Sequence, residues 1–257
     1  MIPYLAIEHF YLGPFKFYVW GFFIALAFLV ALALAIWQGK KIGVEARKIF
    51  YLVIFIYLGA IAGARLFFVL QRPAEFFPDP LMFFRIGEGG MMFYGGLFGG
   101  LLAGWLFIRK WGNCWALISI LTPVVPLTLA IGRIGCFLSN DHLGGLTSLT
   151  WAISWPNGTL RHPVALYLIL FDLALFGFLL WYRKRAKWPG QIFLIFLVIY
   201  GGGRFLLDFT RNVSADPHYW GLAVSQWISL SLLTALILYV ILRNLKKTKF
   251  LSESNNT

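Results

Sequence analysis

Residues 18–37 read YVWGFFIALAFLVALALAIW, a run of twenty residues without a charge. An α-helix rises 1.5 Å per residue, so this run spans about 30 Å, the hydrocarbon thickness of a bilayer. It has neither a basic n-region before it nor a small-residue cleavage site. We therefore interpret it as a retained transmembrane helix and not as a signal peptide.

The composition of the whole chain agrees with this interpretation. Of 257 residues, 60% are hydrophobic and 12% are charged, whereas a soluble domain has about 25% charged residues. We predict an all-α fold, a polytopic membrane protein of about seven transmembrane helices. The expected spans are Tyr18–Trp37, Ile49–Leu70, Met91–Ile108, Trp115–Leu138, Val164–Tyr182, Gln191–Phe209 and Leu222–Leu242.

The basic residues are distributed unevenly between the two sets of loops. Fourteen lie in one set, five in the other and three within spans. Cytoplasmic loops are enriched in Lys and Arg, so this asymmetry predicts an external N-terminus and a cytoplasmic C-terminus. The net charge of +12 then reflects topology, and we expect no nucleic-acid binding. We expect one transmembrane domain at 1–250, with external loops 71–90, 139–163 and 210–221 and a polar tail at 251–257.

Charged residues inside the expected spans are the first candidates for function. Arg65, Arg133 and Arg204 lie toward the external ends of three spans, and Asp172 and Asp208 also lie in spans. A charge in hydrocarbon costs about 2.5–3.5 kcal/mol on insertion scales. A single arginine could snorkel to the headgroups, but three at similar depth favour a common anion site.

The segment YGGGRFLLDFTR, residues 200–211, carries the densest pattern. Its spacings of four, four and three predict that Tyr200, Arg204, Asp208 and Arg211 share one helix face. Arg204 and Asp208 can form an i, i+4 ion pair, which in the simplest alternative only fixes helix packing. The three glycines at 201–203 weaken a helix unless a neighbour or a ligand must approach closely.

Three further motifs lie near the external side. GRIGCFLSNDHLGG, residues 132–145, places Arg133 in a helix before a polar turn that contains Asp141 and His142. FYGGLFGG, residues 93–100, has the small-xxx-small spacing of packed helices. Tyr94, directly before its glycines, is either a functional or an interfacial residue. RHPVALY, residues 161–167, offers His162 as a base or a helix cap.

The cysteines and histidines predict neither a disulfide nor a metal site. Cys114 and Cys136 lie at opposite ends of one expected helix, about 33 Å apart, whereas a disulfide needs Cα atoms within about 7 Å. The four histidines are scattered, and neither cysteine has the spacing of zinc ligands. We therefore expect no metal and no cofactor.

Taken together, these segments resemble the bacterial prolipoprotein diacylglyceryl transferase family. The resemblance covers nearly the whole chain and keeps the order of the motifs. YVWGFF is similar to the family's first-helix motif, GARLFFVL to its second-helix arginine segment, FYGGLFGG to its HGG-type motif and GRIGCFLSNDHLGG to its signature. RHPVALY, YGGGRFLLDFTR and SQW, residues 225–227, follow in sequence.

The resemblance implies a function and a set of site residues. The family transfers a diacylglyceryl group from phosphatidylglycerol to the lipobox cysteine of a prolipoprotein, releasing glycerol phosphate. Such a protein is a multi-pass protein of the bacterial inner membrane, and its partners are that lipid and the prolipoprotein signal peptide. The residues implied to be catalytic are Arg133, Arg204, Tyr94 and Asp141; those implied to bind substrate are Arg133, Arg204, Tyr200, Asp208, Gly144, Trp20 and Cys136.

The sequence also departs from the family pattern. Tyr94 replaces the usual histidine, Cys136 replaces the signature asparagine, and two glutamates are shortened to Asp141 and Asp208. A tyrosine is a weak base because its ordinary pKa is about 10, so Tyr94 either acts by hydrogen bonding or leaves the base to Asp141 or His142. Two alternatives to this function remain open. One is a non-enzymatic phospholipid-binding or transport protein, and the other is a transferase with another acceptor.

Overall fold

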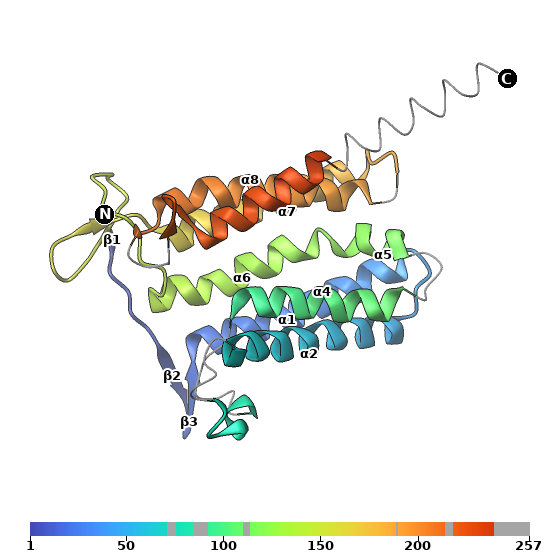
Figure 1. Cartoon of the computed structure of the whole chain (residues 1–257), viewed down its shortest axis with the longest axis horizontal. Helices are drawn as coiled ribbons and strands as arrows, with labels where there is room; N and C mark the ends of the chain where they lie inside the picture. The colour runs from blue at the N-terminus through green and yellow to red at the C-terminus, as the bar shows by residue number, and fades with distance from the viewer. Residues whose placement is uncertain (71–75, 85–91, 110–113, 189, 214–217, 239–257) are drawn as a thin grey trace, which may run out of the picture. The chain divides into compact units, whose positions relative to one another are not determined.

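The computed structural model describes residues 1–70, 76–84, 92–109, 114–188, 190–213 and 218–238 (Figure 1). Most of these residues are helical. The main helices are α1 (Val19–Lys40), α2 (Ala46–Leu70), α4 (Phe93–Ile108), α5 (Cys114–Leu121), α6 (Val124–Ser139), α7 (Val164–Arg183), α8 (Gln191–Leu207) and a further helix at Val224–Leu238. Short 3-10 helices occur at Pro80–Phe84 (η1) and Asp208–Thr210 (η3).

Five helices are long and apolar enough to cross a membrane. They cover Val19–Lys40, Ala46–Leu70, Leu117–Ser139, Val164–Arg183 and Gln191–Thr210, and two shorter apolar helices cover Gly95–Ile108 and Val224–Leu238. Large apolar side chains on these helices are exposed, including Leu29 and Leu58. Apolar surface of this extent would be a liability in water but suits lipid. The predicted class, a multi-pass helical membrane protein, is confirmed.

The all-α prediction is wrong for the loops, which contain short strands. β2 (His9–Leu12) and β3 (Phe15–Tyr18) form a hairpin, β1 (Ile2–Pro3) pairs in parallel with β4 (Ile153–Ser154), and β4 pairs with β5 (Leu160–Arg161). A last hairpin joins β6 (His218–Tyr219) to β7 (Leu222–Ala223). Backbone N–H and C=O groups outside the helices need partners, and short ladders provide them.

The span expected at Trp115–Leu138 overlaps the apolar stretch Leu117–Ser139, but a turn divides it into two helices. α5 ends at Leu121 and α6 begins at Val124, with Pro123 between them. Proline lacks an N–H donor and its ring clashes with the preceding turn, which explains the interruption. Cys114 and Cys136 therefore lie on two helices and not on one, and both are free thiols.

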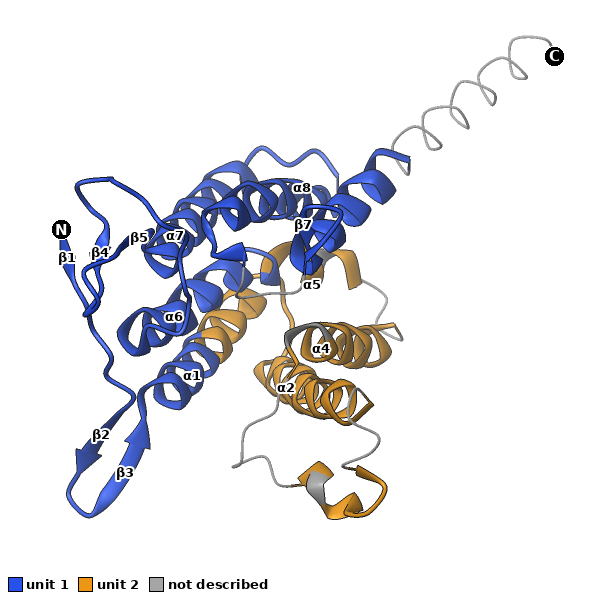
Figure 2. Ribbon diagram, turned by 60° about the vertical axis from the view of Figure 1, so that its left-hand side comes forward, with its two compact units in different colours: residues 1–30, 121–257 blue, residues 31–120 orange. Residues whose placement is uncertain are grey.

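The described chain divides into two compact units (Figure 2). In the unit formed by residues 31–120, α2 packs closely on α4. The Gly63 position meets the backbone of Gly95 and Gly99, and the Gly59 position meets the backbone of Gly99. Side chains larger than hydrogen would hold these backbones apart, so the predicted small-xxx-small packing is confirmed.

The other unit, residues 1–30 and 121–257, contains nearly all the candidate site residues. α6 packs on α7, and α7 packs on α8. A core of Leu175, Leu179, Ile192 and Phe196 joins α7 to α8. At the opposite end of these helices lie the ends of α6 and α8 and the loops that follow them, and these segments form the site (Figure 1).

Candidate functional site

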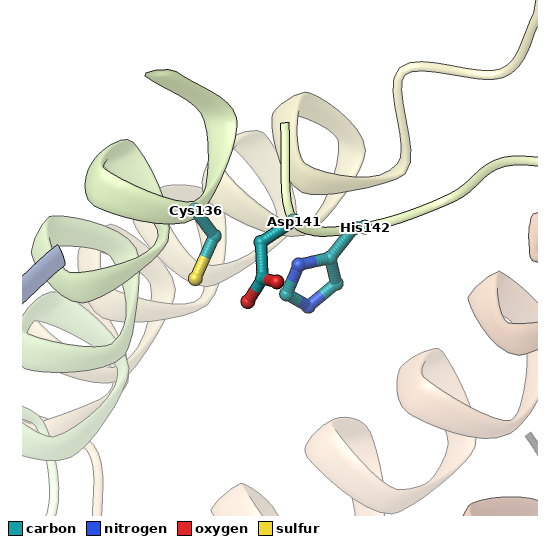
Figure 3. A group of neighbouring side chains, drawn as sticks. All are labelled: Cys136, Asp141 and His142. Atoms are coloured by element: carbon teal, nitrogen blue, oxygen red, sulfur yellow. The ribbon is translucent and has the colours of Figure 1, made fainter. Parts of the chain in front are cut away.

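The end of α6 brings three polar side chains together. Asn140 adopts the left-handed conformation, with φ of 51°, which asparagine tolerates better than most residues. The N–H of Asp141 then donates to the Cys136 carbonyl at 3.0 Å. The chain folds back over the last helical turn, so that Asp141 and His142 lie beside Cys136, as Figure 3 shows. One ligand atom from each residue lies within 4.8 Å of the others.

Gly144 and Gly145 fasten this turn to two other segments. The N–H of Gly145 donates to the Thr210 carbonyl at 2.9 Å, and the N–H of His162 donates to the Gly145 carbonyl at 3.0 Å. A Cβ on Gly144 would collide with the backbone carbonyl of His162. Glycine is therefore required at 144 for packing, and the turn is held against both the start of α7 and the end of α8.

Arg133 on α6 is paired with Asp172 on α7. Its Nε donates to Oδ2 of Asp172 at 3.0 Å, and the side chains are 11% and 0% exposed. A carboxylate this deeply buried needs a cation nearby, because an unpaired buried charge is costly. The pairing therefore holds the guanidinium of Arg133 in one orientation at the end of α6.

Arg204 and Asp208 form the ion pair that their spacing predicts, with 3.1 Å between Nη2 and Oδ1. The Nη1 of Arg204 is buried and has no hydrogen-bond partner among the described residues. Tyr200 lies one turn earlier and stacks on Phe196 at 5.4 Å. The prediction that Arg211 shares this helix face is wrong, because α8 ends at Leu207 and the backbone at Arg211 is extended.

The glycines before Arg204 are explained in part by packing. A Cβ on Gly203 would collide with the ring of Phe171 from α7. Gly202 has no neighbour within 4 Å of a Cβ position, and Gly201 makes only ordinary contacts with Leu232 and Leu233. One of the three glycines thus leaves room for the Phe171 ring where α7 packs on α8.

Positive charge converges on the turn after α6. The pKa of His142 is lowered from its ordinary 6.5 to about 3. The largest cause is burial, and the positive charges of three arginines also contribute. The three arginines are Arg133, Arg211 and Arg204. Arg133 and Arg204 are also close enough to repel one another. Guanidiniums from α6 and α8 therefore face one region, which suits a bound anion, and the imidazole there is neutral.

Two other predicted residues lie near this region. The first turn of α1 packs on α6, where a Cβ on Gly135 would lie 3.2 Å from the Cα of Trp20. The indole of Trp20 lies close to the thiol of Cys136. His162 does not cap α7, since Pro163 occupies that position; its Nδ1 lies 3.3 Å from the Tyr167 hydroxyl.

The remaining predicted residues belong to the other compact unit. The Nε of Arg65 donates to the carbonyl of Phe83 at 3.0 Å, and its guanidinium lies 5.2 Å from the centre of the Phe68 ring. Tyr94 belongs to the first turn of α4, but its side chain lies outside the described residues. The expectation that Arg65 joins a common anion site therefore stays a prediction.

Sequence reasoning missed the partnership of Asp172 with Arg133. It noted both charges within spans but had no means to pair residues 39 positions apart. The available signal was that α6 and α7 are consecutive helices joined by one loop, which makes them candidates for neighbours. It also missed the grouping of Cys136 with Asp141 and His142, which depends on the left-handed Asn140.

The fold is that of a multi-pass membrane protein, and its candidate site is a group of arginines at one end of the helices. The model of the family described as prolipoprotein diacylglyceryl transferase matches residues 8–242. The chain is 34% identical over 239 residues to phosphatidylglycerol–prolipoprotein diacylglyceryl transferase of Bordetella bronchiseptica, covering 87% of this chain and 90% of that one.

Proteins of the same name in two other bacteria are similarly related. The chain is 35% identical over 246 residues to that of Bordetella avium, covering 90% of this chain and 92% of the relative. It is 35% identical over 227 residues to that of Chromohalobacter salexigens, covering 85% and 83%. This protein belongs to the prolipoprotein diacylglyceryl transferase family.

Proposed function

We propose that this protein transfers a diacylglyceryl group from phosphatidylglycerol to the lipobox cysteine thiol of prolipoproteins. The thiol sulfur attacks the terminal glyceryl carbon of the lipid and forms a C–S bond. The bond between that carbon and the phosphate oxygen breaks, glycerol phosphate leaves, and the thiol proton passes to a base or to water. The observation that carries the proposal is the convergence of Arg133 and Arg204 in a chain of this family.

Two arginines suit the demands of this reaction. Arginine stays charged in a poorly solvated site and binds phosphate oxygens in a bidentate manner. In our proposal Arg133 and Arg204 clamp the lipid phosphate and stabilise the charge that grows on it as the C–O bond breaks. The unpartnered Nη1 of Arg204 is a donor available to such a phosphate.

Each arginine has a buried carboxylate that can orient it. Asp172 accepts from Nε of Arg133, and Asp208 lies 3.1 Å from Nη2 of Arg204. Both carboxylates are nearly inaccessible, with exposed fractions of 0% and 1%. Fixing two guanidiniums before the lipid arrives lowers the entropic cost of forming the phosphate contacts.

The other site residues complete the proposal. Tyr200, Trp20 and Cys136 would border the bound lipid, and Gly144 keeps the turn in place. The thiol proton would pass through Tyr94, Asp141 or a bound water.

We also propose an external N-terminus, a cytoplasmic C-terminus and seven spans in the bacterial inner membrane, within one transmembrane domain over 1–250. Basic side chains at the cytoplasmic ends of the expected spans lie over aromatic rings, as interfacial residues do. Lys41 lies 3.3 Å from the Trp37 ring centre, and Arg185 lies 3.9 Å from that of Trp181. The pairing of β1 with β4 supports placing the N-terminus on the same side as loop 139–163.

The test uses the purified full-length protein, phosphatidylglycerol and a lipobox peptide, with the thioether product measured by mass spectrometry. We expect product from the wild type and a loss of most activity in Arg133→Lys and Arg204→Lys, since lysine cannot replace bidentate binding. Arg185→Lys, outside the site, is the matched control. Lipid binding without product would favour the phospholipid-binding alternative, and full turnover in either site variant would remove the clamp.

A further inference from the structure

We propose that Cys136, Asp141 and His142 bind a zinc-class divalent metal ion, and that its open coordination position receives the acceptor thiol. The second part rests on the proposed transferase function, whereas the first part stands without it. The proposal replaces the sequence-based expectation of a protein without a metal.

The geometry of the three side chains carries the proposal. One donor atom from each lies within 4.8 Å of the other two, and Figure 3 shows the carboxylate of Asp141 between the sulfur of Cys136 and the ring of His142. Donor atoms around one tetrahedral zinc ion are separated by roughly 3.3–3.6 Å. The three donor atoms would therefore draw closer together when an ion binds.

The backbone that holds these donors is itself fixed. Cys136 lies in the last turn of α6, and its carbonyl accepts the N–H of Asp141 at 3.0 Å. Beyond His142, the carbonyl of Leu143 accepts the N–H of Asn212 at 3.1 Å. The donors therefore belong to a turn held at both of its ends, which is the support that a metal site requires.

A separate observation is that Nδ1 of His142 is buried without a hydrogen-bond partner in the described part of the chain. Buried polar atoms are nearly always satisfied by protein, water or a ligand. A metal ion bound to this nitrogen would satisfy it.

The donor types also match the ion. Zinc is bound by thiolate sulfur, imidazole nitrogen and carboxylate oxygen, and sites with three protein ligands leave the fourth position open. The positive surroundings do not prevent binding, because a thiolate and a carboxylate together neutralise a divalent ion. The positive charges of Arg133 and Arg204 would then favour an anion beside the metal.

Such an ion would help to deprotonate the acceptor thiol, a task for which the site has no assigned base. The thiolate, not the thiol, is the nucleophile, and a thiol that coordinates a metal is deprotonated. Cys136, Asp141 and His142 would hold the ion, and its open position would bind the acceptor thiol and favour loss of the thiol proton to water. The acceptor sulfur would then form a C–S bond with the glyceryl carbon while the C–O bond breaks with its electron pair on the phosphate oxygen, and Arg133 and Arg204 would stabilise the departing glycerol phosphate.

The first test is a titration of the full-length, chelator-treated protein with Co²⁺, which reports thiolate ligation through a charge-transfer absorption. We expect saturation at about one ion per chain and loss of the band in Cys136→Ser. Asp141→Asn and His142→Asn should weaken binding by more than the roughly 10–100-fold that loss of an outer-shell partner costs. Cys114→Ser, which changes the chain's other cysteine, should bind as the wild type does. Absence of the band, or its survival in Cys136→Ser, would overturn the site.

A second measurement separates this proposal from the transferase function. Arg133→Lys should keep the cobalt band and lose product formation, because the arginine binds lipid and not metal. Zn²⁺ should restore transfer to the chelator-treated wild type by at least tenfold. Equal turnover with and without Zn²⁺ would overturn thiol activation while leaving the transferase in place. A normal cobalt band with no product under any condition would refute the transferase and leave the metal site supported.

Discussion

Arg133 on α6 and Asp172 on α7 are joined by a hydrogen-bonded ion pair of 3.0 Å, with the carboxylate completely buried. The two residues come from opposite sides of the loop at 139–163, so their pairing fixes α7 against α6 where the polar turn begins. The Nε atom makes this bond. The two Nη atoms of Arg133, which form the outer edge of the guanidinium, are thus directed by a buried partner.

Asp172→Asn should lower transfer activity by at least tenfold while the protein still inserts. Asparagine keeps an acceptor oxygen but removes the charge that orients Arg133, so KM for the lipid should rise. Asp172→Ala should also reduce the free energy of unfolding by about 3–5 kcal/mol, the cost of breaking a buried pair. Steady-state kinetics and denaturation in detergent measure the two effects.

The control for that experiment is an exposed ion pair at the start of α2. Glu45 and Lys48 lie 3.3 Å apart, with side chains 67% and 56% exposed, and such pairs contribute about 0–1 kcal/mol. Glu45→Gln should leave both activity and stability unchanged. Equal effects of Asp172→Asn and Glu45→Gln would mean that Arg133 needs no buried partner.

Asp208→Glu should retain activity within a few-fold, whereas Asp208→Asn should lose at least tenfold. The pair with Arg204 is an i, i+4 contact at the end of α8, and the longer carboxylate can still reach the guanidinium. In a double-mutant cycle, Arg204→Lys and Asp208→Asn should be non-additive because they remove one shared interaction. Product formation at saturating lipid measures the coupling, and strictly additive losses would show that Asp208 does not act through Arg204.

Whether an interaction could be predicted from the sequence depended on how far apart its two residues lie along the chain. The Arg204–Asp208 pair and the contact of Gly95 and Gly99 with α2 follow from helical spacing, so both could be predicted locally. The partner of Arg133 is 39 residues away, and nothing in a single sequence selects it. The break at Pro123 was visible in the sequence but was outweighed by continuous hydrophobicity across it.

The polar turn after α6 shows a different limit. Its residues were predicted to matter, but the approach of Asp141 and His142 to Cys136 depends on one left-handed residue, Asn140. Sequence patterns indicate where a helix ends, not the direction in which the chain leaves it. The loop strands were missed for a similar reason, since β1 pairs with a strand about 150 residues later in the chain.

Gly144→Ala should reduce activity at least tenfold, since a Cβ at this position collides with the backbone carbonyl of His162. Backbone atoms cannot rotate away as a side chain can, so the turn carrying Asp141 must shift. Gly145→Ala is the neighbouring control, because its Cβ would make only ordinary contacts, the nearest at 3.4 Å from the Arg211 carbonyl. Transfer assays on both variants compare them, and matching losses would remove the packing explanation.

Gly99→Ala tests the packing of α2 on α4. A Cβ on Gly99 collides with the carbonyl of Gly59 and lies 2.9 Å from the Cα of Gly63, so the helices must separate. Overpacking of this kind costs about 1–3 kcal/mol. In a membrane no hydrophobic effect drives the two helices together, so close packing is the main contribution to their association. Gly177→Ala, at a helical position with open space around it, should be neutral or slightly stabilising. Thermal denaturation in detergent distinguishes the two variants: a lower melting temperature is expected only for Gly99→Ala, and an equal melting temperature would mean that the close approach of α2 and α4 contributes nothing to stability.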